Sequence, residues 1–346
     1  MNSWRQLMLP LFCSLLLLIA LAPAAAAQKY TVTDLGTLGG NSSGATAINA
    51  LGQITGYSYV PGGNALSHTF LYSGGRMTDL GTLGGNSAIG NGINSTGQVA
   101  GYSTNAAGNY RAFLYSNGTL TDLGDLGGGT ADGYAINDAG EVVGTSVLAD
   151  GDYHPFLYSN GRMTDLGTLG SDTPGWWNAA LGINSQGDVV GTSYDAKGNF
   201  LGFLYKNGHM HSIGTLGGLW SEAYAVNNSD EITGIAYTAG DLEAHAFLFA
   251  GGKMRDLGVP VQFVGATSWG FGINSAGDVV GQGDCLCSAG YHAFLYQNGK
   301  MMDLNNLIAP GTGWTLTEGK GINDLGEIVG YGMIGGQQHA FLLTPQ

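Results

Sequence analysis

One phrase recurs along this chain and constrains its fold more than any other feature. In its second copy the phrase begins at residues 78–86 (TDLGTLGGN), continues at 93–101 (INSTGQVAG) and ends at 112–115 (AFLY). Seven copies follow one another, each marked by one invariant asparagine: Asn49, Asn94, Asn137, Asn184, Asn227, Asn274 and Asn323. A spacing of 43 to 49 residues is typical of architectures in which every repeat is one supersecondary unit.

Each copy has the pattern of four short strands. Residues 94–97 (NSTG) form a tight turn after the first strand, because Asn starts such turns and Gly tolerates positive φ. Asn117-Gly118 is the strongest two-residue hairpin signal and joins the third strand to the fourth. Four strands in this length make one propeller blade. The sequence therefore predicts an all-β fold, a seven-bladed β-propeller, as a single domain over residues 28–346.

Small and bulky residues alternate between the strands in every copy. Glycine recurs in the second strand, as at Gly101, where it marks a close approach of two backbones. The third strand always supplies a phenylalanine: Phe70, Phe113, Phe156, Phe203, Phe247, Phe294 and Phe341. Bulk packed against glycine fills a dense interior, so these positions are predicted to be core.

The two ends of the chain are predicted to pair. The last copy stops after a third strand at residues 339–343, and the chain begins with an isolated fourth strand at residues 30–35. Pairing them removes an open sheet edge and lets the N-terminal strand close the last blade.

A side-chain pair supports this closure. A two-residue hairpin places Phe70 opposite Asp79, with His68 on the same face within hydrogen-bonding reach of Asp79. Related pairs recur as His154–Asp165, His245–Asp256, His292–Asp303 and Arg111–Asp122, whereas copy four has Leu201 and Ser212. Closure would join the remaining His339 and Asp34. A catalytic group is not needed five times, so these pairs are predicted to be structural.

The N-terminus resembles a secretory signal. Arg5 is followed by an apolar run and by Ala25-Ala26-Ala27, a small-residue cleavage site. Residues 1–27 are therefore predicted to be a signal peptide. We expect a secreted protein, extracellular or periplasmic, without a stable membrane anchor after cleavage near Ala27. An uncleaved membrane anchor is the disfavoured alternative.

Charge excludes two classes of partner. The chain has 11 Lys+Arg against 25 Asp+Glu, a formal net charge of -14, whereas nucleic acids and anionic membranes need clustered basic residues. Cys285 and Cys287 leave three states open: a small-ring disulfide, free thiols, or metal ligands together with His292. The metal state is disfavoured because a second spaced ligand pair is missing.

Function is expected where the copies differ. Five tryptophans fall in segments predicted to join successive blades: Trp176, Trp177, Trp220, Trp269 and Trp314. Exposed Trp faces stack on sugars or hold peptide side chains, although burial at the rim of the core fits equally well. Acidic residues of other loops, Asp150 and Asp152 or Asp241 and Glu243, could take calcium but lack a specific motif. No cofactor is predicted.

The repeated phrases His-Ala-Phe-Leu-Tyr, Asp-Leu-Gly-Thr-Leu-Gly-Gly and Ile-Asn-x-x-Gly-x-Val-x-Gly resemble the extracellular HAF-repeat family of bacterial secreted proteins. The resemblance covers residues 29–346 and implies no particular activity. Copy four (residues 201–203) and copy six (residues 256–260) depart most from the pattern.

Three functions fit the sequence. The leading hypothesis is a non-enzymatic propeller that binds a glycan or an extracellular protein through the Trp-bearing segments. The second is a carbohydrate-active hydrolase or lyase, which needs carboxylates that are unique to one or two copies and converge near the axis. Glu222 and Glu318, just before the first strands of their copies, are the candidate catalytic carboxylates. The third is a purely structural component of an envelope or matrix. Ligand and oligomeric state are left open.

Overall fold

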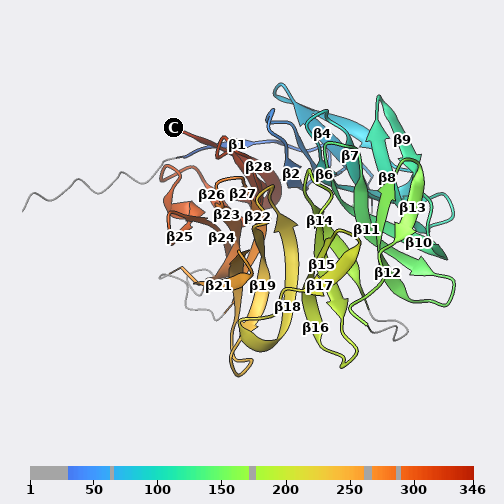
Figure 1. Ribbon diagram of the computed structural model, residues 1–346. Coiled ribbons are helices and arrows are strands. Elements are labelled where there is room, and N and C mark those ends of the chain that lie inside the picture. Colours follow the sequence, from blue (N-terminus) through green and yellow to red (C-terminus); the bar gives the residue numbers. More distant parts are fainter. Residues whose placement is uncertain (1–29, 63–65, 171–176, 261–266, 286–289) are drawn as a thin grey trace, which may run out of the picture.

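The computed structural model describes residues 30–346, apart from 63–65, 171–176, 261–266 and 286–289 (Figure 1). Strands dominate these residues, and a short 3-10 turn, η1 (Leu304–Asn306), interrupts them. The all-β prediction is confirmed. Over the same residues, no helix has the length and apolar character needed to cross a membrane. The predicted signal peptide lies outside the described residues.

The strands form five four-stranded sheets and one eight-stranded sheet. The larger sheet consists of two four-stranded units that a single parallel bridge, Ser67 to Ser87, holds together. Its strands are β2 (Ser43–Ile48), β3 (Ile54–Tyr59), β4 (Ser67–Ser73) and β5 (Arg76–Gly81), then β6 (Gly84–Ile93), β7 (Val99–Asn105), β8 (Tyr110–Ser116) and β9 (Thr119–Asp122).

The other sheets repeat the same antiparallel order. The first contains β10 (Gly127–Ile136), β11 (Val142–Leu148), β12 (Tyr153–Ser159) and β13 (Arg162–Asp165). The second contains β14 (Ala179–Ile183), β15 (Val189–Tyr194), β16 (Phe200–Lys206) and β17 (His209–Ser212). The third contains β18 (Gly217–Val226), β19 (Ile232–Thr238), β20 (Ala244–Ala250) and β21 (Lys253–Gly258). The fourth contains β22 (Ser268–Ile273), β23 (Val279–Cys285), β24 (Gly290–Gln297) and β25 (Lys300–Asp303). The last contains β26 (Trp314–Ile322), β27 (Ile328–Ile334), β28 (Gln337–Pro345) and β1 (Tyr30–Asp34).

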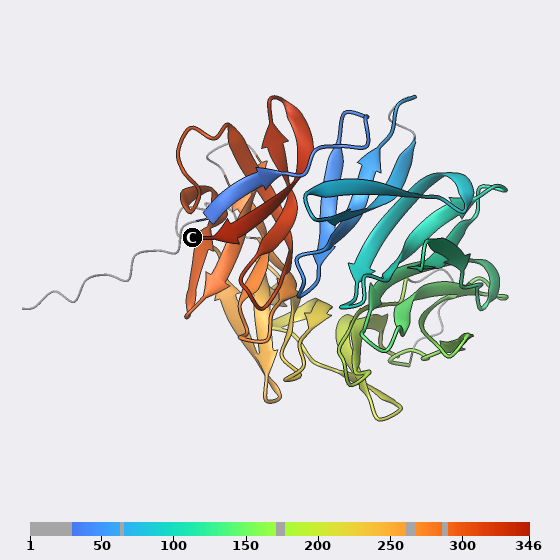
Figure 2. The same ribbon diagram turned by 90° about the horizontal axis from the view of Figure 1, so that it is seen from above.

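The sheets stand around a central axis in chain order. Each unit places its first strand innermost, and these inner strands contact one another in sequence from β2 to β26. Strand β26 in turn contacts β2, so the ring of inner strands is complete. Figure 2 shows the same circuit, running from the blue strands through green and yellow to red. This radial arrangement is that of a β-propeller.

The chain ends pair as predicted. Strand β1 lies antiparallel to β28, from Tyr30 opposite Pro345 to Asp34 opposite Phe341, and the two strands are adjacent in Figure 1. The outer strand of this sheet therefore comes from the other end of the chain. The exposed edge that β28 would otherwise present is covered.

The predicted side-chain pairs are also present. In each His–Asp pair, the histidine Nδ1 atom lies 2.8 or 2.9 Å from the nearer carboxylate oxygen. In the second copy, Nε of Arg111 lies 3.7 Å from Asp122, and the guanidinium also binds Asp125. Leu201 and Ser212 occupy the equivalent places in β16 and β17. The pairs lie on the outer strands, far from the axis, in agreement with a structural role.

The invariant phenylalanines form the core. All seven are completely buried between the sheets. Gly101 shows why the second strand needs glycine, because a Cβ there would overlap the carbonyl oxygen of Ile89 and lie 2.9 Å from the Phe113 ring. The close approach predicted from the sequence is thus between β7 and its neighbour β6.

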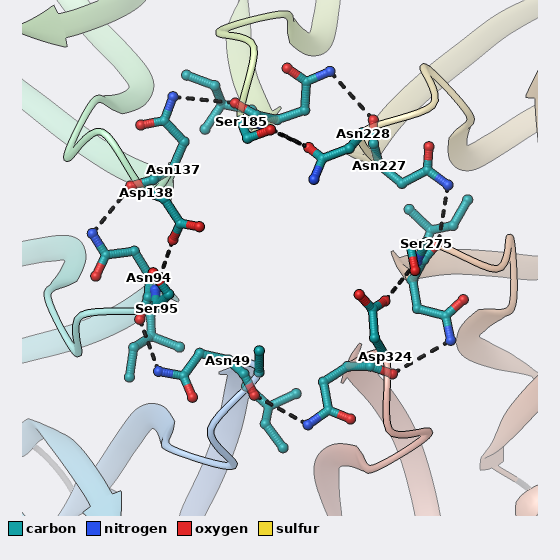
Figure 3. Close-up of a pocket in the computed structure, with 18 of the residues that line it drawn as sticks. Asn49, Asn94, Ser95, Asn137, Asp138, Ser185, Asn227, Asn228, Ser275 and Asp324 are labelled. Carbon is teal, nitrogen blue, oxygen red and sulfur yellow. Dashed lines mark hydrogen bonds between the residues drawn. The ribbon is translucent and has the colours of Figure 1, made fainter.

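The invariant asparagines form a closed hydrogen-bonded ring around one end of the axis (Figure 3). The Nδ2 atom of each donates to the backbone carbonyl of the next, and Asn323 completes the circle by donating to Asn49 over 3.2 Å. Each Oδ1 accepts backbone N–H groups of its own turn, as Asn94 does from Thr96 and Gln98. This ring surrounds a depression of about 250 Å³. It satisfies its buried polar groups internally and fixes the register of the inner strands.

Candidate functional site

A central channel runs along the axis of the ring of strands, and the asparagine ring surrounds one of its ends. The copies differ at the other end. We call it the variable end and define it by the residues three and five positions before each invariant asparagine. The nearer residues are Thr46, Asn91, Tyr134, Leu181, Tyr224, Phe271 and Lys320, and they line a cavity of about 270 Å³. The farther residues come two positions earlier in the same strands. They are Gly44, Ile89, Asp132, Ala179, Glu222, Trp269 and Glu318. Seven equivalent places thus carry largely unlike side chains, in contrast to the uniform asparagine ring.

Glu318 is the most enclosed carboxylate of the variable end. It lies in β26 and is 4% exposed. The Tyr331 hydroxyl donates a hydrogen bond to it, and the Lys320 ammonium forms an ion pair with it. Lys320 also lies over the Phe271 ring, with Nζ 3.8 Å from the ring centroid. A buried carboxylate needs such partners, because burial without them is costly.

Glu222 lies in a different environment. Burial raises the pKa of this carboxyl from an ordinary value of 4.5 to about 7, although a hydrogen bond with Tyr224 acts in the other direction. Tyr224 packs on Phe271 with ring centroids 5.3 Å apart. Burial, and then the negative charges of Glu222 and Glu318, raise the pKa of the Tyr224 hydroxyl. Both predicted carboxylates therefore lie around Tyr224 at the same end of the channel, inside inner strands rather than ahead of them.

Asp132 belongs to this site and was not predicted. It stands five residues before Asn137, as Glu222 and Glu318 stand five residues before Asn227 and Asn323. Aligning the copies on the asparagine would have identified it, because this one register position carries all three acids. Burial raises the pKa of Asp132 to about 6.

The sequence predicted all five tryptophans in segments that join the blades, but three of them lie in strands. Trp220 and Trp269 lie inside β18 and β22, and Trp314 begins β26. The inner strands start earlier than the repeat pattern indicated, because residues such as Gly217 already pair with the second strand. Trp177 comes two residues before β14, and Trp176 lies outside the described residues.

Two of the tryptophans share one aromatic cluster. The Phe200 ring lies between them, with centroids 6.0 Å from Trp220 and 6.5 Å from Trp177. The cluster extends to Tyr134, whose ring meets Trp177 edge-on at 6.5 Å, and to Tyr237, 5.4 Å from Trp220. These half-buried rings span three successive sheets beside Asp132 and Glu222.

The other two tryptophans are placed separately. Trp269 meets the exposed Tyr291 edge-on, with centroids 5.6 Å apart. Trp314 packs against the buried Phe341 at 6.1 Å and joins the core of its sheet. Trp314 therefore fits the alternative of burial at the rim of the core.

The acidic loop residues have local partners. Asp241 Oδ1 accepts the backbone N–H of Leu219 at 2.8 Å, and Asp150 accepts that of Asp152 at 3.3 Å. Throughout the described part of the chain, no group of three or more His, Cys, Asp and Glu side chains is arranged to hold a metal ion. The side chains of Cys285 and Cys287 lie outside the described residues, so their state stays a prediction.

Comparison with known proteins identifies the fold but no family. No family model matches the chain, and no curated protein matches it. Among solved structures it is similar to the β-propeller domain of the Trilobed protease from Pyrococcus furiosus, with a TM-score of 0.53 and 9% identity over 92% of this chain and 98% of that one. It is also similar to a puromycin-hydrolyzing peptidase of Mycobacterium tuberculosis, with a TM-score of 0.56, 12% identity and 84% of this chain covered.

A third similar structure is TolB from Acinetobacter baumannii, with a TM-score of 0.48, 12% identity and 85% of this chain covered. The match spans 63% of the TolB chain and 50% of the peptidase. At these identities the likeness to the Trilobed protease domain and to the peptidase shows a β-propeller fold alone.

Proposed function

We propose that the chain is a secreted, seven-bladed β-propeller that binds an extracellular glycan at the variable end of its channel. The blade number counts every four-stranded unit as one blade, including the two joined in the eight-stranded sheet. One invariant asparagine for each inner strand supports this number. We also propose that the chain belongs to the HAF-repeat family whose phrases it carries.

The contrast between the two ends of the channel carries the binding proposal. At the asparagine end all seven copies keep the same side chain and use its hydrogen bonds within the ring. At the variable end the same strands present three acids, a lysine and several aromatic rings. Repeats that are needed only to build the ring have no reason to diverge at one end, whereas a binding site needs unlike groups that converge.

A glycan suits this surface best. The half-buried rings of Trp177, Phe200 and Trp220 form an aromatic row next to carboxylates and hydroxyls. Sugar rings present apolar faces that stack on aromatic rings and hydroxyls that bond to carboxylates. Lys320 is neutralised by Glu318, so little positive charge is available for an acidic ligand.

Calorimetric titration with neutral, acidic and amino oligosaccharides tests this function. We expect binding of at least one class, and loss of that binding in Trp220→Ala without a matching fall in melting temperature. A flat response across all three classes would overturn the glycan proposal.

A second candidate function, a carbohydrate-active hydrolase, is favoured by the unlike surroundings of Glu222 and Glu318. Burial raises the pKa of the Glu222 carboxyl to about 7, whereas Glu318 forms an ion pair with Lys320. Two carboxyl groups in unlike environments are the pattern of a general acid beside a carboxylate base or nucleophile. Release of reducing sugar from the oligosaccharide that binds, abolished in both Glu222→Gln and Glu318→Gln, would support it. Binding without turnover favours the non-enzymatic function.

A further inference from the structure

Asp132 differs from the other two acids of the variable end in having no compensating partner within the described part of the chain. Its Oδ1 atom is shielded from solvent and has no hydrogen-bond donor among the described residues. Glu318 is paired with Lys320, and Glu222 is bonded to Tyr224. Burial is the cause of the raised pKa of Asp132, about 6, so at pH 7 the group is mainly ionised. An ionised, poorly solvated carboxylate without a donor costs free energy, which a bound cation would offset.

Two tyrosines lie close enough to Asp132 to be influenced by its charge. Tyr102 belongs to β7 of the neighbouring unit, and burial followed by the charge of Asp132 raises the pKa of its hydroxyl to about 12. Tyr134, two residues after Asp132, is influenced by the same charge and meets Trp177 edge-on. Tyr110 adds a ring 5.8 Å from Tyr102. A carboxylate near a group of aromatic rings is a combination that recognises organic cations.

We propose that Asp132 binds the ammonium group of an amino sugar, so that the ligand is a glycan with free amino groups. This inference rests on the proposed glycan-binding function and names its ligand class. The ammonium would approach Asp132 beside Tyr102, while neighbouring sugar rings stack along Trp177, Phe200 and Trp220. That aromatic row, continuous with Asp132 through Tyr134, favours linked sugar rings over a single lysine side chain. The formal net charge of -14 adds long-range attraction for a cationic chain.

Three tetrasaccharides on the full chain test this inference: the glucosamine tetramer, its N-acetylated form and the neutral glucose tetramer. Acetylation removes the positive charge and leaves the sugar backbone unchanged. We expect the glucosamine tetramer to bind roughly ten- to a hundredfold more tightly than the other two in calorimetry at pH 6.5, the range of a charge-assisted contact. Added salt should weaken its binding and leave that of the neutral tetramer unchanged.

Asp132→Asn removes the charge and keeps the shape of the side chain. It should lower affinity for the glucosamine tetramer about tenfold or more without changing affinity for the acetylated form. Asp138→Asn, at the asparagine end, is the matched control and should change neither. Thermal unfolding should show that Asp132→Asn is folded, because the carboxylate it replaces has no donor to lose.

The outcomes separate the two proposals. Binding of the acetylated or neutral tetramer with equal strength, or an Asp132→Asn variant that binds glucosamine as wild type does, overturns the amino-sugar inference and leaves glycan binding intact. Binding of trilysine but of no tetrasaccharide overturns both, because the cation site would then serve a peptide. If Asp132→Asn fails to fold, the salt dependence and the acetylation contrast of the wild-type protein still decide the matter.

Discussion

The Nδ1 atom of His339 lies 2.9 Å from Oδ2 of Asp34, although 305 positions separate the two residues. The same carboxylate accepts the backbone N–H of Gly36 at 2.8 Å. Asp34→Ala removes both interactions, and we expect a loss of about 1 kcal/mol in the free energy of unfolding, since the pair is partly exposed. Urea denaturation monitored by tryptophan fluorescence measures it.

Asp79→Ala is the matched control inside the ring. It removes the equivalent pair with His68 and the hydrogen bond from Gly81 and should lose a similar amount of stability. Only Asp34→Ala should also loosen the strand that joins the two chain ends, detected as faster proteolysis near residue 30. Neither variant should change ligand affinity. Lost binding at unchanged stability in Asp79→Ala would contradict the structural role of these pairs.

Most of the architecture could be predicted because the repeat exposes it. Local signals such as Asn117-Gly118, where both residues have positive φ, identify the hairpins. A strand that is ambiguous in one copy can be assigned by comparison with the other copies. The pairing of β1 with β28 followed from strand counting and from the leftover His339 and Asp34. The starts of the inner strands could not be predicted, because the divergent segments there pair through backbone groups that carry no side-chain signal.

The His245–Asp256 pair makes stability depend on pH in a defined window. The hydrogen bond to Asp256 raises the pKa of His245 above 6.5, so its stabilisation is present below pH 6.5 and is lost as pH rises through the raised value. Burial acts to raise the pKa of Asp256, but the hydrogen bonds from His245 and Gly258 outweigh it and hold this pKa below its ordinary value of 3.8. The contribution of Asp256 is therefore present above pH 3.8 and lost at lower pH. Asp256→Asn should therefore cost most, about 1 kcal/mol, between roughly pH 4 and 6.5. An equal cost from pH 4 to pH 9 would contradict the charge pair.

Glu222 should make the folded protein less stable as pH rises from about 4.5 to about 7. Burial raises the pKa of its carboxyl to about 7, so over this range the folded state keeps a proton that the unfolded state has released. Glu222→Gln should remove this loss, which is on the order of 1–3 kcal/mol. Denaturant midpoints across the range measure it, and the exposed Glu243→Gln is the control. A wild-type slope retained in Glu222→Gln would show that this carboxyl is ionised in the fold.

Two glycine substitutions separate lack of space from backbone strain. Gly101→Ala places a methyl group where it clashes with the carbonyl oxygen of Ile89 and the Phe113 ring. We expect the free energy of unfolding to fall by about 3 kcal/mol or more. Gly118→Ala meets open space but must adopt a φ of 82°, which should cost about 1 kcal/mol. Melting temperatures rank the two. Equal effects would mean that β7 can move away from β6.

The site could be predicted only in part. Glu222 and Glu318 were identified because each breaks the repeat, whereas Asp132 was missed although it shares their register. The aromatic cluster escaped prediction for a different reason: Phe200 lies in β16, and its contacts with Trp177 and Trp220 depend on how neighbouring sheets pack. Such contacts between units leave no periodic trace in the sequence.

Trp220 and Trp314 should therefore respond in opposite ways to removal. Trp220 stacks on Phe200, with an angle of 21° between the rings, at the variable end. Trp220→Ala should abolish most ligand binding and most ligand-induced fluorescence change. Trp314 packs on Phe341 within a buried cluster, so Trp314→Ala should lower stability by about 3 kcal/mol and leave affinity unchanged in the folded fraction. If Trp220→Ala only destabilises the fold, or Trp314→Ala only weakens binding, the tryptophans have been assigned to the wrong roles, and the ligand site would have to be sought in the last sheet beside β26.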